Sequence, residues 1–507
     1  MKKLFILIFT LFTITSYSQD EPFYRGVDPA SFVQRAVLDL PVGFVLESWS
    51  TFHDQPIAIL QHPTRSNFMA VAERKGLIWL YELKNGVWVI FPNPIIDIQN
   101  QVTKFFERGI QNIVMDSHHI YVYYTVEESY LFFGDVPENT ATINRVSRWE
   151  ISWSQNRTVG GEQIKIGVNP ADGIPSLAGN HQGGGMAFGD NGFLYISTGD
   201  GANVPFADKA VEFGIIDEEY KNLSGNYRSQ VLSQGNGKIL KIQGWTGKGV
   251  SSNPYYSGST PYSFKSRLFD YGYRNPFRIT YSDSIYVADV GDASREEITI
   301  AKSDGNAGWG KYEGFDELNF SSTISNPDTG QPFEINYTNP PLLDYGHNSN
   351  AETRLLNPND FSSPFIDGNS IAGNSLTGGV VLKEGFGNYT GGYIFSDYTR
   401  GWLNIAMNGF DFTINFASEG TVNSAVDITQ LSDGSVLVVK LFGGIDRISF
   451  DGNLSTPDHE FNYDLATVKY FTMLGVELKD ISNAASGIYI VEYYYNNQYK
   501  RKIIPKL

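Results

Sequence analysis

The chain has 507 residues, a formal net charge of −17 and no cysteine. The lack of cysteine excludes disulfides, thiol catalysis and cysteine metal sites, and the acidic balance argues against a nucleic-acid partner, which binds a basic face. A chain of this length can bury a large core without cross-links. Its 51 Gly, 30 Tyr and 34 Phe favour many short strands joined by glycine turns.

The first 18 residues have the pattern of a secretory signal peptide. Lys2 and Lys3 precede a short apolar run, residues 4–14, and small residues follow before Gln19. The apolar run is shorter than the roughly 20 residues of a membrane-spanning helix, and no later stretch reaches that length. We therefore predict no membrane span and export through the periplasm, so that the protein is secreted or lies at the outer-membrane surface.

Six apolar and aromatic runs next to turns are predicted to be the inner strands of six small antiparallel sheets. Such sheets arranged radially form a β-propeller, so we predict an all-β, six-bladed propeller over residues 22–452. Uneven spacing predicts long insertions around residues 201–235 and 310–375. A two-sheet β-sandwich is the alternative, although this length is less natural for it. The six runs are residues 68–73, 120–125, 194–199, 285–290, 393–398 and 436–441.

The glycine-rich stretch 179–201 holds the main candidate for chemistry. Asn191 and Gly192 predict a tight primed turn with positive φ at both residues, which would place His181 opposite Asp200 across one hairpin. A histidine beside a carboxylate can accept a proton near neutral pH, because the carboxylate fixes its tautomer and stabilises the protonated ring. A solvated or purely structural histidine is the alternative.

The composition changes after residue 452. Residues 453–460 are polar with a proline, as in a linker. Residues 461–507 carry strand-like runs and a basic end, and they resemble a shortened C-terminal sorting domain of the type IX secretion system of Bacteroidetes. The resemblance implies that the type IX secretion machinery is a partner that carries the protein across the outer membrane, with removal of the tail and release or surface attachment. It rests on residues 468–475, 486–491 and 502–504.

Six further motifs accompany the 179–201 stretch. Together they resemble the glucose/sorbosone dehydrogenase family in order and spacing, from about Leu40 to Phe450. This family includes soluble quinoprotein aldose sugar dehydrogenases and the propeller of hedgehog-interacting proteins. The resemblance implies an exported dehydrogenase that oxidises an aldose or related sugar hydroxyl by hydride transfer to pyrroloquinoline quinone, with Ca²⁺. The motifs are residues 106–110, 236–242, 271–278, 285–298, 306–314 and 376–379.

The resemblance also implies catalytic roles for three residues. His181 would be the base, Asp200 its orienting partner, and Arg274 an electrophilic contact at the quinone carbonyl. Arg274 offers a fixed fork of donors suited to such oxygens, whereas an arginine considered alone is more often paired with a structural carboxylate.

Further residues match positions that hold the cofactor and the metal. Gly291 and Asp292 match where the family supplies oxygen ligands to calcium, a hard cation that prefers oxygen. An aspartate in a turn is also commonly just a turn residue. The cofactor-binding set implied by the resemblance is Glu107, Arg274, Asn275, Thr377 and Arg400.

The last part of the chain departs from the quinone-binding pattern. Residues 423–428 lack the arginines expected before Asp427, and Arg400 stands where a lysine is expected. A cofactor with three carboxylates needs cations to offset its burial, so these differences weaken the quinone prediction. The alternative function is a non-enzymatic propeller that binds carbohydrate or protein at the cell surface, where aromatic loops such as residues 309–312 could stack on sugars.

Overall fold

The computed structural model of the protein describes most of the chain, and the structural statements below concern these residues. They are residues 32–35, 40–49, 53–132, 139–203, 205–321, 323–348, 350–407, 409–450, 467–472, 477–479, 487–495 and 498–506. The predicted signal peptide and the linker at residues 453–460 lie outside them. Within the described chain, no helix is long and apolar enough to cross a membrane.

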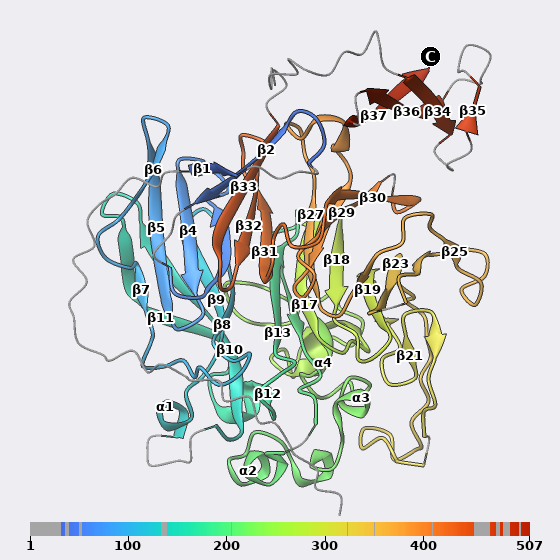
Figure 1. Cartoon of the computed structure of the whole chain (residues 1–507). Coiled ribbons are helices and arrows are strands. Elements are labelled where there is room, and N and C mark those ends of the chain that lie inside the picture. Colours follow the sequence, from blue (N-terminus) through green and yellow to red (C-terminus); the bar gives the residue numbers. More distant parts are fainter. Residues whose placement is uncertain are drawn as a thin grey trace, which may run out of the picture.

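The fold is an all-β propeller, as predicted (Figure 1). Neighbouring strands in its sheets are antiparallel, with two short parallel pairings among the described strands, and most of them follow one another in the chain. The first three sheets contain β3 (Pro56–Gln61), β4 (Phe68–Glu73), β5 (Leu77–Lys84), β6 (Val87–Ile90) and β7 (Ile96–Asp97); β8 (Ile110–Met115), β9 (His119–Thr125), β10 (Thr142–Ser152), β11 (Arg157–Ile166) and β12 (Ile174–Ser176); and β13 (Gly183–Phe188), β14 (Leu194–Thr198), β15 (Lys238–Ile242), β16 (Leu268–Tyr271) and β20 (Gly305–Asn306).

The remaining sheets of the propeller complete the ring. The sixth sheet joins both ends of the propeller, because β2 pairs with β33. These sheets contain β17 (Pro276–Ser282), β18 (Ser284–Asp289), β19 (Arg295–Ile300), β23 (Leu343–His347), β24 (Thr353–Leu355), β25 (Phe365–Ile366) and β26 (Ala372–Gly373); β27 (Leu376–Val381), β28 (Tyr393–Asp397), β29 (Leu403–Met407) and β30 (Phe412–Ala417); and β31 (Ala425–Gln430), β32 (Val436–Lys440), β33 (Gly444–Phe450), β2 (Phe44–Trp49) and β1 (Phe32–Arg35).

The innermost strands are not the ones predicted. The strands that contact one another around the ring, in the order β3, β8, β13, β17, β27 and β31 and back to β3, are the first strands of the six sheets described. The predicted runs are instead the second strands, β4, β9, β14, β18, β28 and β32. A second strand is paired on both edges and buried along nearly its whole length, so its sequence is the most uniformly apolar.

Each innermost strand begins with a β-bulge. The register shifts directly after the first residue of every one of these six strands, for example between Gly183 and Met186 and between Pro276 and Arg278. A bulge bends a strand and re-aims its side chains. The bulges lie where the loops enter the inner strands, and we call this end of the propeller the site face.

Both predicted insertions are present, and the first of them carries two of the four α-helices of the described chain. Figure 1 shows α1, α2 and α3 gathered at one side of the sheets. Residues 201–235 hold α2 and α3, and residues 310–375 hold the short hairpin of β21 (Tyr312–Glu313) and β22 (Asp316–Glu317). The helices are α1 (Glu128–Phe132), α2 (Ala207–Glu212), α3 (Gly225–Arg228) and α4 (Phe264–Arg267), with 3₁₀ turns η1 (Pro170–Asp172), η2 (Glu218–Tyr220) and η3 (Gly387–Tyr389).

The C-terminal segment forms a separate antiparallel sheet, in agreement with the strand-like runs of its sequence. Its strand order is β35-β34-β36-β37, and β36 pairs with β37 along its whole length. The bounds are β34 (Thr467–Thr472), β35 (Glu477–Leu478), β36 (Gly487–Tyr495) and β37 (Gln498–Lys506).

Candidate active site

His181 and Asp200 form a hydrogen-bonded pair at the site face of the third sheet. His181 precedes β13 and Asp200 follows β14, so the hairpin brings them together. Nδ1 of His181 lies 2.8 Å from Oδ1 of Asp200. The His181 side chain is 12% exposed and the Asp200 side chain only 2%. The buried carboxylate thus holds Nδ1 and leaves the other ring nitrogen, Nε2, available for a proton.

The turn of this hairpin differs from the predicted primed turn. Gly192 has a φ of 74°, but Asn191 is not among the residues with positive φ. The Asn191 side chain accepts the Phe193 N–H instead, and Gly189 N–H donates to the Phe193 carbonyl, which makes a longer loop closed by one left-handed glycine. The hairpin register that aligns His181 with Asp200 is unaffected by this difference.

The surroundings of Asp200 keep it ionised. Burial by itself raises the pKa of this carboxyl, but the charge of His181 and its hydrogen bond act in the opposite direction. The charges of Arg274 and Arg228 add to that effect, and the pKa falls to about 2. Oδ2 of Asp200 also accepts the indole N–H of Trp309 at 2.8 Å. An anionic Asp200 can therefore stabilise a protonated His181 at any pH near neutrality.

The backbone around the pair is closely packed and strained. His181 has a φ of 55°, a region that few residues other than glycine adopt. A Cβ atom on Gly199 would lie 2.0 Å from the His181 carbonyl oxygen, so the approach of these two segments requires glycine. The Asp200 N–H donates to the Arg274 carbonyl at 2.7 Å. These contacts fix the pair relative to the loop before β17.

Glu107 contacts the histidine loop from the second sheet. Its Oε2 accepts the backbone N–H of His181 at 2.8 Å, and its own N–H donates to the Gly179 carbonyl at 3.0 Å. The protein around Glu107 removes part of its hydration and raises its pKa, against the opposing positive charges of His181 and Arg274. Its side chain nevertheless keeps a solvent-exposed surface. Glu107 thus belongs to the same site as the His181–Asp200 pair.

Arg274 lies across the loop that follows β18. Its Nη1 donates to the carbonyls of Val290 (3.1 Å) and Gly291 (2.5 Å), and its Nη2 pairs with the Asp292 carboxylate at 2.8 Å. The guanidinium also lies over the Trp309 ring, with its central carbon 5.4 Å from the centroid. Its Nε is buried and has no hydrogen-bond partner among the described residues.

Asn275 is held in place from two sides. Its side-chain oxygen accepts the Gly183 N–H at 3.0 Å, which links the loop before β17 to the start of β13. The carboxylate of Asp289 accepts the backbone N–H groups of Asn275 (2.7 Å) and Arg274 (3.0 Å). Burial raises the pKa of Asp289 to about 7. Asp289 therefore positions both residues of the predicted Arg274–Asn275 pair.

The predicted calcium ligands have protein partners instead. The Gly291 carbonyl and one oxygen of the Asp292 carboxylate both accept from Arg274, so these oxygen atoms already have a cationic partner. The backbone N–H groups of residues 292–295 all donate to one oxygen of Glu313. In the part of the chain the structure describes, no group of three or more His, Cys, Asp or Glu side chains is placed to hold a metal ion. These residues do not fit calcium as they are arranged.

Two predicted cofactor residues also have structural partners. The Thr377 hydroxyl donates to the Ala425 carbonyl at 2.6 Å, and its side chain is buried. Arg400 pairs with Glu419 at 2.9 Å. Asp427, which the sequence shows without preceding arginines, lies 3.4 Å from Nε of Arg278. The structure therefore does not bring Thr377 and Arg400 into contact with the His181–Asp200 pair.

Sequence reasoning gave no site role to Asp289 and Arg228, and it treated Trp309 only as an aromatic that could stack on sugars. Trp309 and Arg228 bind Asp200 from separate insertions, the former through its indole N–H and the latter by donating from Nε to the Asp200 carbonyl at 3.0 Å. Only Asp289 had a readable signal, because it is the penultimate residue of the predicted run 285–290, and Asp200 directly follows the predicted run 194–199.

Comparisons with known proteins find relatives that match part of the sequence. The HIPL2 and HIPL1 proteins of Arabidopsis thaliana are 29% and 27% identical over 196 and 181 residues, which are 37% and 33% of this chain. The matched regions are only 25% and 24% of those relatives, so the chain spans about a quarter of their length.

Solved structures share the fold at low sequence identity. A glucose dehydrogenase is 15% identical with a TM-score of 0.54, covering 80% of this chain and 98% of that one. The soluble aldose sugar dehydrogenase of Escherichia coli, in its apo form, is 14% identical with the same TM-score, covering 80% and 99%. The family described as Glucose / Sorbosone dehydrogenase matches residues 53–338, more than half of the chain. The chain therefore belongs to the glucose/sorbosone dehydrogenase family.

Proposed function

We propose that this protein is an exported dehydrogenase that oxidises a hydroxyl of an aldose or related sugar, with His181 as the base. The observation that carries the proposal is the His181–Asp200 pair, 2.8 Å apart and joined through Asp200 to Trp309 and Arg274. A histidine whose Nδ1 is held by a buried carboxylate, and whose Nε2 is free, has the arrangement of a general base.

Each residue of the site has a separate role in the proposed reaction. Nε2 of His181 accepts the proton of the substrate hydroxyl, and Asp200 stabilises the imidazolium that forms because its own pKa stays near 2. The Glu107 carboxylate accepts the backbone N–H of His181 and so holds the strained backbone of that residue. The free Nε–H of Arg274 is the donor for an oxygen that becomes more negative during oxidation.

The residues of the site fit only one end of a quinone cofactor, the end that carries its carbonyl groups. Arg274 with its unpartnered Nε, its neighbour Asn275 and the nearby Trp309 ring would hold the carbonyl end of pyrroloquinoline quinone. When bound, this cofactor supplies the acceptor for the hydride of the substrate carbon. Arg400 is already paired with Glu419, so the three carboxylates of the cofactor have fewer cations than the family pattern implies. We therefore expect weak quinone binding, and we assign no step to calcium.

The proposal also includes export of the protein and a six-bladed architecture. The pattern of residues 1–18 supports cleavage of a signal peptide, and the small sheet at β34–β37 supports a shortened type IX sorting domain at residues 461–507 that leads to secretion or surface attachment. We interpret the six sheets whose first strands form a closed ring as six blades, and the two-stranded sheet of β21 and β22 lies outside this ring.

The direct test is dye-linked oxidation. The mature protein is incubated with pyrroloquinoline quinone, with and without Ca²⁺, and dye reduction is followed with a panel of aldoses and polyols. We expect reduction with at least one sugar, and quenching of tryptophan fluorescence by the quinone that weakens in Arg274→Ala. Absence of any quinone binding up to high micromolar concentration contradicts the proposal.

A second function is favoured by the ion pair of Arg400 with Glu419, which removes a cation from the proposed cofactor set. In this alternative the site face binds carbohydrate or protein without turnover. A His181→Asn variant separates the two readings. If dye reduction is lost while sugar binding and the melting temperature are kept, the binding-only reading is excluded.

A further inference from the structure

Arg74 connects the first sheet to the loop that carries Glu107. It directly follows β4, and its Nη1 donates to the carbonyls of Phe106 and, at 3.0 Å, of Arg108. Phe106 has a φ of 53°, so Arg74 binds a strained loop at the two residues that flank Glu107. The guanidinium is therefore fixed next to the residue whose carboxylate accepts the His181 N–H.

No carboxylate of the described chain forms an ion pair with Arg74. Its hydrogen bonds go to neutral oxygen atoms, the two backbone carbonyls and the Gln55 side chain at 2.7 Å, while the nearby Asp54 is paired with Lys75. Its Nη2 makes no hydrogen bond to a described residue. Arg74 is half-buried, and the loss of hydration lowers its pKa. One edge of this guanidinium is thus available for an anionic partner.

The other arginines discussed for the cofactor are paired already. Arg274 contacts Asp292 at 2.8 Å, and Arg400 contacts Glu419 at 2.9 Å. A ligand with several carboxylates needs cations to offset its burial. Of these three arginines, only Arg74 keeps a charge that no carboxylate of the described chain contacts.

A tyrosine from the fifth sheet lies near both Arg74 and Glu107. Tyr398 follows β28 and packs against the hydrophobic cluster that contains residues 68–72 of β4. Burial raises the pKa of its hydroxyl, the charge of Arg74 lowers it, and the charge of Glu107 raises it. This hydroxyl makes no hydrogen bond to another described residue. The O–H group and the open edge of the guanidinium are two donors, which suit an acceptor with two oxygen atoms, as a carboxylate has.

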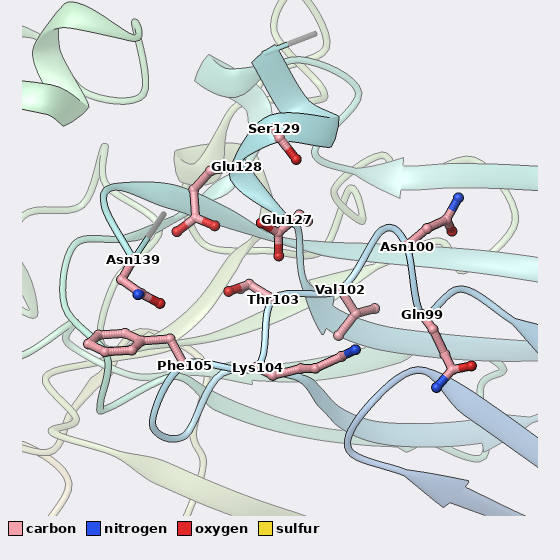
Figure 2. A pocket seen from close by; sticks show the side chains of 10 residues that line it. All are labelled: Gln99, Asn100, Val102, Thr103, Lys104, Phe105, Glu127, Glu128, Ser129 and Asn139. Atoms are coloured by element: carbon pink, nitrogen blue, oxygen red, sulfur yellow. The ribbon is translucent and has the colours of Figure 1, made fainter. Parts of the chain in front are cut away.

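Lys104 is a cation on the same segment that lacks these contacts. Figure 2 shows its side chain extending away from Phe105 and toward Gln99, along a cavity that Glu128 also lines. Lys104 is exposed and pairs with no carboxylate of the described chain. Replacing it removes the same charge from the same segment without touching the loop carbonyls, so it is the matched control.

We propose that Arg74, together with Tyr398, binds a carboxylate group of the ligand that occupies the site. Where this carboxylate belongs to the quinone, the inference rests on the proposed dehydrogenase function, and Arg74 supplies a cation that the sequence before Asp427 lacks. A uronic acid carries the same group, and for this source the inference stands on the contacts of Arg74 alone.

The first experiment measures quinone binding. Quenching of tryptophan fluorescence is titrated with pyrroloquinoline quinone and with its trimethyl ester, which carries none of the three negative charges. In Arg74→Gln we expect the Kd of the acid to rise about ten-fold and that of the ester to change less than about two-fold, because only a charge-assisted contact is lost. Arg74→Lys should lie between them, since it keeps the charge and loses the fork. Lys104→Gln should change neither Kd.

The second experiment measures binding of a sugar acid. Without quinone, saturation-transfer NMR compares glucuronate with glucose in the same variants. A preference for glucuronate that Arg74→Gln removes and Lys104→Gln keeps supports the inference and assigns the carboxylate to the substrate. Tyr398→Phe removes one hydroxyl and no charge, and it should weaken binding of the preferred anion about five-fold. This variant tests the same site if Arg74→Gln does not fold, as its melting temperature would show.

A purely structural role of Arg74 predicts a different result. The inference is overturned if Arg74→Gln weakens the acid and the ester equally and leaves glucuronate binding unchanged, or if Lys104→Gln has the same effect as Arg74→Gln. If the wild type binds glucuronate through Arg74 but binds no quinone, the carboxylate site stands and the dehydrogenase proposal fails. If dye reduction occurs while Arg74→Gln binds both anions like the wild type, the dehydrogenase proposal stands and this inference fails.

Discussion

The fourth and fifth sheets both end their second strand with an aspartate that binds a neighbouring loop, but the two loops carry different side chains. Asp289 at the end of β18 accepts the backbone N–H groups of Arg274 and Asn275, and Asp397 at the end of β28 accepts those of Asn374 and Ser375. In each sheet, an aspartate at the end of the second strand fixes the loop that enters the first. Only in the fourth does this loop carry an arginine that reaches toward the His181–Asp200 pair.

The difference lies in which side chains the fixed loops present and in how those side chains are already partnered. Arg274 keeps one free donor beside Trp309, whereas Arg400, on the loop after β28, is paired with Glu419. A repeated fold therefore places loops equivalently, but chemistry depends on whether a side chain keeps a free donor or acceptor. The predictions below contrast these two regions, starting with the largest expected effect.

Loss of the base should have the largest effect. His181→Asn keeps the left-handed backbone, because asparagine tolerates a positive φ better than alanine does, and it leaves no proton acceptor for the substrate. We expect kcat/KM to fall about 10³-fold, within the range of general-base catalysis, with the melting temperature nearly unchanged. Dye-reduction kinetics and thermal denaturation measure both quantities. A loss below ten-fold would show that His181 is not the base.

Asp200→Asn should reduce kcat/KM about 10²-fold, because the amide no longer stabilises the protonated ring. It should also change the pH dependence of stability. The pKa of Asp200 is about 2 in the folded state, below its ordinary value of 3.8, so its contribution is present above about pH 4 and is lost as the pH falls toward 2. That contribution is about 2 kcal/mol.

Urea denaturation at pH 6 and at pH 2.5 measures this contribution. The difference in unfolding free energy between the wild type and Asp200→Asn should shrink at the lower pH. A difference that stays constant over this range would mean that the carboxylate is not held by its positive neighbours in the folded protein.

Matched arginine substitutions test the comparison itself. Arg274→Lys removes the fork that spans Gly291, Asp292 and the free Nε–H, and we expect kcat/KM to fall about ten- to a hundred-fold. Arg400→Lys keeps a charge next to Glu419 at a partly exposed position, so we expect a change of less than about two-fold. Steady-state kinetics with one sugar decide between them. Equal losses in the two variants would place Arg400 in the site and remove the contrast between the sheets.

Calcium should have the smallest effect. The Gly291 carbonyl oxygen and one carboxylate oxygen of Asp292 accept hydrogen bonds from Arg274, so millimolar Ca²⁺ should shift the melting temperature of the cofactor-free protein by less than about 1 °C. Differential scanning calorimetry with Ca²⁺ and with EDTA measures the shift. A rise of several degrees that Asp292→Asn removes would show that the metal displaces the guanidinium.

Local patterns in the sequence were enough to predict the repeated strands and the close approach of His181 and Asp200. Six apolar and aromatic runs next to turns predicted a propeller, and a single hairpin joined His181 to Asp200. The error about which strand is innermost has a physical cause. Second strands are buried along nearly their whole length and are strongly apolar, while the true inner strands start with bulges that have no simple sequence pattern.

Other features depend on contacts between distant segments. Asp200 is bound by Trp309, which lies 109 residues further along the chain, and the helical insertion before β15 supplies Arg228. The fold decides which groups come within hydrogen-bonding distance, and so it decides that Arg274 donates to the Gly291 carbonyl and that Arg400 is paired with Glu419. The sequence by itself therefore determined the strands and the His181–Asp200 pair, because these depend on neighbours in the chain. Only the tertiary structure decided which donors remain free, because partners from distant sheets compete for them.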